Sequence, residues 1–511
     1  MTCLKAPRRN DKSQIRNPKH IQMIKIERVS SNRCRGTRDF PLDTRPSTLV
    51  SFRISIFGFR IFIYLWRAIT PILLALLLGV GFSVVAYGQT NPPNSPSAVR
   101  CPTVADPHKL YLECRGQLFD SIEETLTQDW AGFRTELNKF GISPTVSYTA
   151  DLMGNATGGQ SRGFTYAGTL QAAIFWDLGK LIRLPGLAFN IGAAWSTGKN
   201  LSANYIGNSF TIQNAYGSPD NGTNNLMLGE VYLQQQLFNN SLMIAAGRLA
   251  PSSSFATMPV LGNYVNGGIN ANPGALGIND VTFASHPPAV QWGAQAIFNI
   301  TPAVQAAVGV FNNNPNSASG AKGGLDFTFQ EGNRGVFSVV QVNYLFNHAE
   351  GDTGLPGQYT LGGSYNSNRF SSLRNENASE SGTYNVYGLF QQMIYRDGDA
   401  SSQKGLTVWG ETVLAPKSSV NTMPYFVGGG LSYQGLIPRR DNDIVSTGLI
   451  YGSFSRFIPH TTAETVIEVN YQITLKRWLS IMPDMQYVIR PSGSSAIRNA
   501  FVLGTEVTIS F

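Results

Sequence analysis

Apolar and polar side chains alternate with a period of two from about Ile142 to the last residue of the chain. Between Thr462 and Leu475 the odd-numbered positions are mostly apolar and the even-numbered ones mostly polar, with Val466 as the one apolar exception on the polar side. Successive side chains of a β-strand point to opposite faces, so this period predicts strands with one oily and one polar face. The same pattern occurs at 290–299, 304–311, 477–490 and 501–511.

Alternation of this kind also occurs in a soluble β-sandwich. Here charged and amide side chains share one face along many strands, and aromatic side chains share the other. In a membrane barrel the polar face lines a wet lumen and the apolar face meets lipid. The final residue, Phe511, ends such a strand, which is typical of an outer-membrane barrel and predicts recognition by the barrel-assembly machinery.

The length of the patterned region sets the number of strands. Roughly 370 residues at about ten per strand, plus short turns and long loops, support an all-β fold: a transmembrane antiparallel up-and-down barrel of about 16 strands. Counts of 14 or 18 remain open. The Gly- and Asn-rich stretches 207–225, 262–282 and 312–323 are expected to be extracellular loops. Pro483 lies inside a strand pattern and requires a bulge or a missing ladder bond.

A helical pattern precedes the strands. Trp130, Phe133, Leu137 and Phe140 fall at helical spacing, a capping residue stands at Thr127 or Asp129, and Gly141 ends the run. The spacing predicts a short amphipathic helix over 127–140 that packs against the periplasmic end of the barrel.

Composition agrees with a barrel that has one wet and one greasy face. Only 14% of the residues are charged and the mean hydropathy is -0.08, whereas a soluble protein carries about 25% charge. The net charge of +8 comes from residues 1–88, which contain 15 Lys and Arg against 4 Asp and Glu. The remainder has 24 basic and 27 acidic residues. The sequence contains no basic stripe and no zinc-finger spacing, so a nucleic-acid partner is not expected.

The first 88 residues form a leader. An uncharged apolar run over about 69–85 follows Arg67 and ends at Ala86-Tyr87-Gly88, which predicts a signal peptide cleaved after Gly88. A transmembrane helix is the competing interpretation, because the run approaches the required length of about 20 residues. The basic stretch before it suggests a true start near Leu49 or Val50. Residues 89–141 are expected to form a periplasmic extension that includes the helix, and 142–511 the barrel.

Two cysteines lie in the exported part. Cys101 and Cys114 would enter an oxidising compartment, which favours a disulfide between them. Two unpaired thiols remain the alternative, because the sequence supplies no geometry. Their spacing does not match a metal site, and no cofactor is expected.

Several stretches resemble the OprB-type carbohydrate-selective porins. Leu126–Leu137 resembles the pattern LTGDWGGLRTxL of that family, with Gln128 and Ala131 in place of two glycines. Leu201–Asn208 resembles a loop signature of the family, and the resemblance continues through Glu230–Gln235, Ala246–Leu249 and Pro483–Val488. It implies a 16-stranded outer-membrane porin that passes monosaccharides passively. Its partners would be small saccharides and outer-membrane lipids, and the barrel would be a monomer or a homotrimer.

A sugar pore needs hydrogen-bonding groups at its constriction rather than a catalytic group. By parity, Glu230, Tyr232 and Gln234 share one face. Arg248 is costly on a lipid face, so it is expected to point inward and to pair with Glu230 in the lumen. A selective constriction and a purely structural salt bridge are both consistent with that pair. The further channel-lining candidates are Asn204, Tyr205, Glu411, Glu464 and Glu468.

Enzymatic function is not expected. His108, His286, His348 and His460 are isolated and have no metal-ligand spacing. A general-diffusion porin, or a barrel with receptor, adhesin or hydrolase activity, is the alternative function.

Overall fold

The computed structural model describes residues 125–213, 215, 225–283, 290–314, 323–325, 327–329, 335–348 and 352–511. The expected leader, the cleavage site after Gly88 and the two exported cysteines lie outside these residues. Among the described residues, no helix is both long and apolar enough to cross a bilayer.

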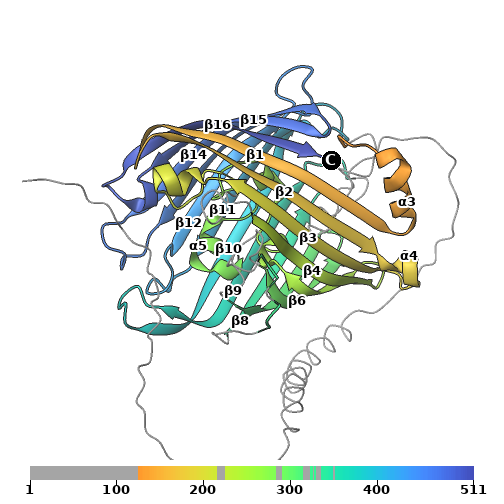
Figure 1. Ribbon diagram of the computed structural model, residues 1–511, viewed down its shortest axis with the longest axis horizontal. Coiled ribbons are helices and arrows are strands. Elements are labelled where there is room, and N and C mark those ends of the chain that lie inside the picture. The colour runs from red at the N-terminus through yellow and green to blue at the C-terminus, as the bar shows by residue number, and fades with distance from the viewer. Residues whose placement is uncertain are drawn as a thin grey trace, which may run out of the picture. The chain divides into compact units, whose positions relative to one another are not determined.

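The strands form one closed antiparallel barrel in which each strand pairs with its neighbours in sequence and β1 pairs with β16. Figure 1 shows β1 in orange beside β16 in dark blue at this seam. The expected count of 16 strands is confirmed. The strands are β1 (Ile142–Gly159), β2 (Gly163–Asp177), β3 (Leu187–Gly198), β4 (Asn225–Leu237), β5 (Leu242–Leu249), β6 (Gln291–Thr301), β7 (Val304–Asn313), β8 (Gly335–Phe346), β9 (Gly357–Ser371), β10 (Ser379–Arg396), β11 (Gly405–Leu414), β12 (Tyr425–Gln434), β13 (Ile444–Ser453), β14 (Ala463–Lys476), β15 (Leu479–Ile489) and β16 (Arg498–Ser510).

The alternation in the sequence corresponds to the two faces of this wall. On β14, Ile467 and Val469 are more than a third exposed on the outside, whereas Glu464 and Glu468 are fully buried on the inside. β6 repeats the pattern with exposed Phe298 and buried Gln295. An apolar outer band with polar groups inside is what a lipid-embedded barrel requires.

Pro483 lies on β15 without shifting its register. Pairing with β14 passes from Asn470↔Asp484 directly to Ile473↔Ile481, so the ladder partners next to the proline are missing. On the other side Pro483 pairs in register with Thr505 of β16. A proline has no N–H to donate, and here this produces a missing ladder bond rather than a bulge.

The N-terminal helix differs from the expected one. The turn η2 (Trp130–Gly132) and the helix α3 (Phe133–Lys139) replace one continuous helix over 127–140. Phe133 and Phe140 of the expected packing stripe are more than half exposed, and Arg134 is the buried residue. The aromatic stripe is therefore not the surface that holds this helix.

Arg134 ties this segment to the barrel seam. Its Nη2 donates to the main-chain oxygen of Phe511 at 2.6 Å, and its Nη1 donates to Thr125 Oγ1 at 2.8 Å. The guanidinium lies 4.6 Å from the centre of the Trp130 ring, in cation–π contact. The Leu126 N–H donates to the Ser510 carbonyl at 2.9 Å. The segment that precedes β1 is thus bonded directly to the end of β16.

The two residues that replace family glycines are in left-handed backbone conformations. Gln128 has φ 49° and Ala131 has φ 57°. Such angles suit glycine, and any other residue adopts them at a cost. The glycines of the related motif therefore follow from the shape of this turn, which the present chain keeps with larger residues.

The remaining short elements are loop structures. They are α4 (Leu178–Ile182), η3 (Ser202–Ile206), η4 (Pro251–Ser253), η5 (Pro259–Asn263), α5 (Gly274–Asn279), η6 (Val281–Phe283) and η9 (Pro491–Gly493). The long connections β3–β4, β5–β6 and β7–β8 leave one end of the barrel, and connections such as β6–β7 and β14–β15 at the other end are short. Long loops are extracellular and short turns periplasmic in outer-membrane barrels, which orients the chain.

Candidate functional site

Two of the expected extracellular loops enter the barrel. The segment 250–283 between β5 and β6 contains Tyr264, Val265 and Ile269, all with no exposed surface. The segment 199–213 between β3 and β4 buries Phe210 and Ile212 in the same cluster. The expected extracellular loop 262–282 does not stay outside the barrel, because its apolar side chains pack inside the wall. Figure 1 shows α5 within the ring of strands.

Glu464 on β14 holds the first of these loops. Its carboxylate accepts the Ser209 N–H at 2.9 Å and the Phe210 N–H at 2.8 Å, and it also accepts the Ser492 N–H from η9. A buried backbone N–H without a partner is costly, and an ionised acceptor makes a stronger bond than a neutral one. Glu464 therefore allows two separate loop segments to lie against the inner wall.

Glu468 lies four residues further along β14 and binds the backbone of the second loop in the same way. It accepts the Val265 N–H at 2.7 Å and the Asn266 N–H at 3.1 Å. The neighbouring Asn470 donates to the Asn263 carbonyl at 3.0 Å. Both glutamates face inward as expected and accept backbone N–H groups of the loops, and Glu468 also accepts the Asn470 Nδ2–H at 2.9 Å.

Three further wall side chains support the two loops. Gln341 on β8 accepts the Ala256 N–H at 2.7 Å, and Gln391 on β10 accepts the Val260 N–H at 3.0 Å. Asp151 on β1 accepts the Ala215 N–H at 2.6 Å. These three were not among the expected site residues. Their inward parity was visible in the sequence, but the loops they contact were not.

The inner wall also presents apolar side chains to the loops. Trp409 on β11 donates its Nε1–H to the Tyr264 hydroxyl at 2.7 Å, and the two rings lie edge to face at 5.2 Å. Val466, the exception in the β14 alternation, is fully buried in this cluster. The exception arises because this stretch of wall faces the loop core, not water. The lumen is therefore partly a hydrophobic core.

The β4 candidates lie as the alternation predicts. Tyr232 and Gln234 are buried on the inner face, and Leu233 between them is exposed on the outer face. Glu230 accepts the Ala250 N–H at 2.9 Å, at the base of the loop 250–283. This is another contact between a wall carboxylate and the loop backbone.

Arg248 does not face the lumen, contrary to the expectation. It pairs directly with Val231 on β4 and Trp292 on β6, and residues directly opposite in an antiparallel pair share a face. Trp292 alternates with the buried Gln291 and lies on the outer face. The expected lumen pair with Glu230 is therefore wrong.

A covering segment explains how an arginine is tolerated on that face. Arg248 is 2% exposed, and the described residues 323–325 and 327–329 supply its covering contacts. Its Nη1 donates to the Gly324 carbonyl, and its guanidinium stacks at 4.9 Å from the centre of the Phe327 ring. The lipid penalty assumed for an outward arginine does not apply, because protein covers the charge.

Asn204 and Tyr205 lie in η3, where the first loop begins. Asn204 Nδ2 donates to the Asn200 carbonyl at 2.7 Å. The Tyr205 carbonyl accepts the Ser161 N–H at 2.9 Å, and its ring occupies the space beside Gly163. A Cβ at Gly163 would lie 2.1 Å from that ring, so a glycine is required there. Both residues build the rim of the barrel where the loop turns inward.

Glu411 on the inner face of β11 is the exception among the carboxylates. It is 3% exposed, and both of its carboxylate oxygens lack a hydrogen-bond partner among the described residues. Within the same residues, no cluster of three or more His, Cys, Asp or Glu has the arrangement of a metal site.

Residues 161–511 match the model of the carbohydrate-selective porin OprB family. The chain belongs to this family. The family is one of channels rather than enzymes, and the protein is an outer-membrane carbohydrate porin.

Individual relatives are distant in sequence but nearly complete in coverage. Porin B of Pseudomonas aeruginosa is 22% identical over 438 residues, which is 77% of this chain and 93% of that protein. A putative porin QuiX of Acinetobacter baylyi is 22% identical over 433 residues, 76% of this chain and 93% of that protein. The high-pH structure of Pseudomonas putida OprB superimposes with a TM-score of 0.69 at 22% identity, covering 76% of this chain and 99% of that one. It supports the barrel fold.

Proposed function

We propose that this porin passes single small neutral sugars by passive diffusion, and that the loop segments 199–213 and 250–283 set its size limit. The observation that supports this most directly is the anchoring of both loops inside the wall by Glu464 and Glu468. A barrel of 16 strands is wide enough for an aqueous channel when its lumen is empty. Loops fixed in that lumen narrow it toward the size of one sugar ring.

The inner wall supplies chemistry suited to polyols. Gln305, Asn343 and Thr360 on β7, β8 and β9 form a hydrogen-bonded series with distances of 2.8 Å between successive partners. Such groups donate and accept without a net charge, as a neutral sugar does.

The expected site residues have different roles. Glu230, Glu464 and Glu468 position the loops, and Tyr232 and Gln234 belong to the wall behind them. Asn204 and Tyr205 shape the rim. In this proposal the protein works as a channel and not as an enzyme, and none of these residues acts as a catalyst.

Export and assembly complete the proposal. We expect cleavage of a signal peptide after Gly88 and recognition of the strand ending in Phe511 by the barrel-assembly machinery. A Cys101–Cys114 disulfide and a monomeric or trimeric state remain predictions. Mass spectrometry of the mature protein, with and without reduction, tests the cleavage site and the disulfide.

The transport proposal is tested with proteoliposomes. The purified porin is expected to give rapid swelling with a neutral hexose and much slower swelling with a trisaccharide of the same osmolarity. Steady single-channel currents in KCl show that the reconstituted barrel is open. Equal swelling rates for both sugars would contradict a size limit set by the loops, and open channels without hexose uptake would contradict the sugar proposal.

A further inference from the structure

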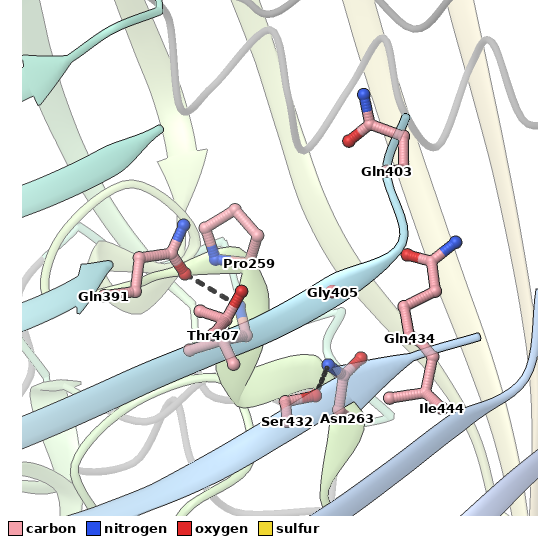
Figure 2. Close-up of a pocket in the computed structure, with 10 residues that line it drawn as sticks. Pro259, Asn263, Gln391, Gln403, Gly405, Thr407, Ser432, Gln434 and Ile444 are labelled. Atoms are coloured by element: carbon pink, nitrogen blue, oxygen red, sulfur yellow. Dashed lines mark hydrogen bonds between the residues drawn. The ribbon is translucent and has the colours of Figure 1, made fainter. Parts of the chain in front are cut away.

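A cavity of about 230 Å³ lies between the tip of the loop 250–283 and the inner wall. Its floor is η5, with Pro259 and Val260, and its walls come from β10, β11, β12 and the start of β13. Figure 2 shows the polar side chains Gln391, Thr407 and Asn263 around this space. The wall residues belong to the strand ends next to the short β10–β11 and β12–β13 turns, so the cavity lies toward the periplasmic mouth of the barrel.

Strand register makes the cavity a feature of the inner wall. Thr407 on β11 pairs directly with Ser432 on β12, and Gly405 pairs with Gln434. Trp409, two residues after Thr407, is buried inside the barrel and pairs with Gln391 on β10. Alternation therefore sends Thr407, Ser432 and Gln391 inward together.

The chemistry of the lining is neutral. Apart from glycine it consists of amide and hydroxyl side chains together with Pro259, Val260 and Ile444, and it contains no charged side chain. The carboxylates of the same wall, Glu464 and Glu468, lie outside it. Amides and hydroxyls match the hydroxyl groups of a sugar, and the three apolar side chains suit its C–H face.

Part of this hydrogen-bonding capacity is unused within the described residues. Gln391 uses Oε1 to accept the Val260 N–H, which leaves its NH₂ group available. Asn263 donates from Nδ2 to Ser432 Oγ at 2.9 Å, which leaves its Oδ1 available. The Thr407 hydroxyl has no hydrogen-bond partner among the described residues.

The cavity is also held in shape without a ligand. The Tyr264 hydroxyl, next to η5 in sequence, lies 3.0 Å from the Leu431 carbonyl and 2.9 Å from the Thr447 carbonyl. The two bonds made by Gln391 and Ser432 fix the loop tip itself. A preformed site loses less entropy on binding than one that must be ordered.

We propose that this cavity is a binding subsite for one neutral monosaccharide, at which the sugar pauses before it leaves toward the periplasm. A volume of about 230 Å³ has room for one sugar ring. The inference rests on the sugar transport proposed above and adds a place and a partner chemistry to it.

The test uses D-glucose as the probe and Thr407→Val as the variant. Valine keeps the shape of threonine and removes its hydroxyl. In planar bilayers, glucose is expected to reduce the KCl current of the wild type in a saturable manner. Half-saturation in Thr407→Val is expected at about fivefold higher glucose, the effect of losing one hydrogen bond. Thr407→Ser, which keeps the hydroxyl, is expected to restore wild-type half-saturation.

Thr508→Val is the matched control. Thr508 faces the same lumen from β16, opposite Thr149 and Ser480, and does not line the cavity. Equal half-saturation in Thr407→Val and the wild type, an equal shift in Thr508→Val, or a wild-type current that falls linearly with glucose would each overturn the subsite. Proteoliposome swelling separates the two proposals: absence of glucose uptake by the wild type refutes sugar transport, whereas normal uptake with no effect of Thr407→Val refutes only the subsite.

Discussion

Replacing Glu464 by Gln tests whether wall carboxylates hold the loops in the lumen. Glu464 is fully buried and both of its oxygens accept backbone N–H groups, from Ser209, Phe210 and Ser492. Glutamine keeps one acceptor oxygen and places an NH₂ group where the other stood. At least one loop N–H then loses its partner, which costs about 1–3 kcal/mol.

The lost hydrogen bond is expected to destabilise the attached loop more than the barrel as a whole. A cost of about 2 kcal/mol raises the population of the detached loop about 30-fold. Hydrogen exchange measured by mass spectrometry on peptides covering 201–213 is therefore expected to accelerate by about that factor. Peptides from β8 and β9, which do not contact Glu464, are expected to exchange at the wild-type rate.

Glu411→Gln is the matched control. It makes the same chemical change on the same inner face, but neither oxygen of Glu411 has a partner among the described residues. Removing a buried charge without a partner is expected to leave the barrel as stable as before or more stable. Unchanged exchange at 201–213 in Glu464→Gln, or equal acceleration in Glu411→Gln, would refute the anchoring argument.

Three other predictions concern parts of the molecule outside the lumen. Ala131→Gly is expected to stabilise the folded protein by about 0.5–1 kcal/mol, because φ is 57° at this position; denaturant titration checks it, and a destabilised variant would show that the angle is not costly. Arg134→Ala is expected to destabilise the protein by about 2–3 kcal/mol, since hydrogen bonds to a charged group at the seam are lost. A smaller cost than for Lys139→Ala, an exposed residue, would refute the stabilising role of the Arg134 contacts. Arg248→Met is expected to leave hexose swelling unchanged, because the side chain lies outside the lumen; slowed swelling in a folded variant would return Arg248 to the sugar path.

The strands and the barrel could be predicted from the sequence because their cause is local. A period of two in side-chain polarity, as in Thr462–Leu475, assigns each residue to a face before any partner strand is known. The inward positions of Tyr232, Gln234, Glu464 and Glu468 followed from this parity alone. The family followed from short stretches such as Leu126–Leu137.

The tertiary structure decided what the inward residues touch. Glu464 meets Phe210, and Glu468 meets Val265, across more than 200 residues of sequence. The outward position of Arg248 depends on distant residues that cover it, among them Gly324 and Phe327. Parity says which face a side chain is on, but only the path of the loops says whether that face meets water, lipid or protein.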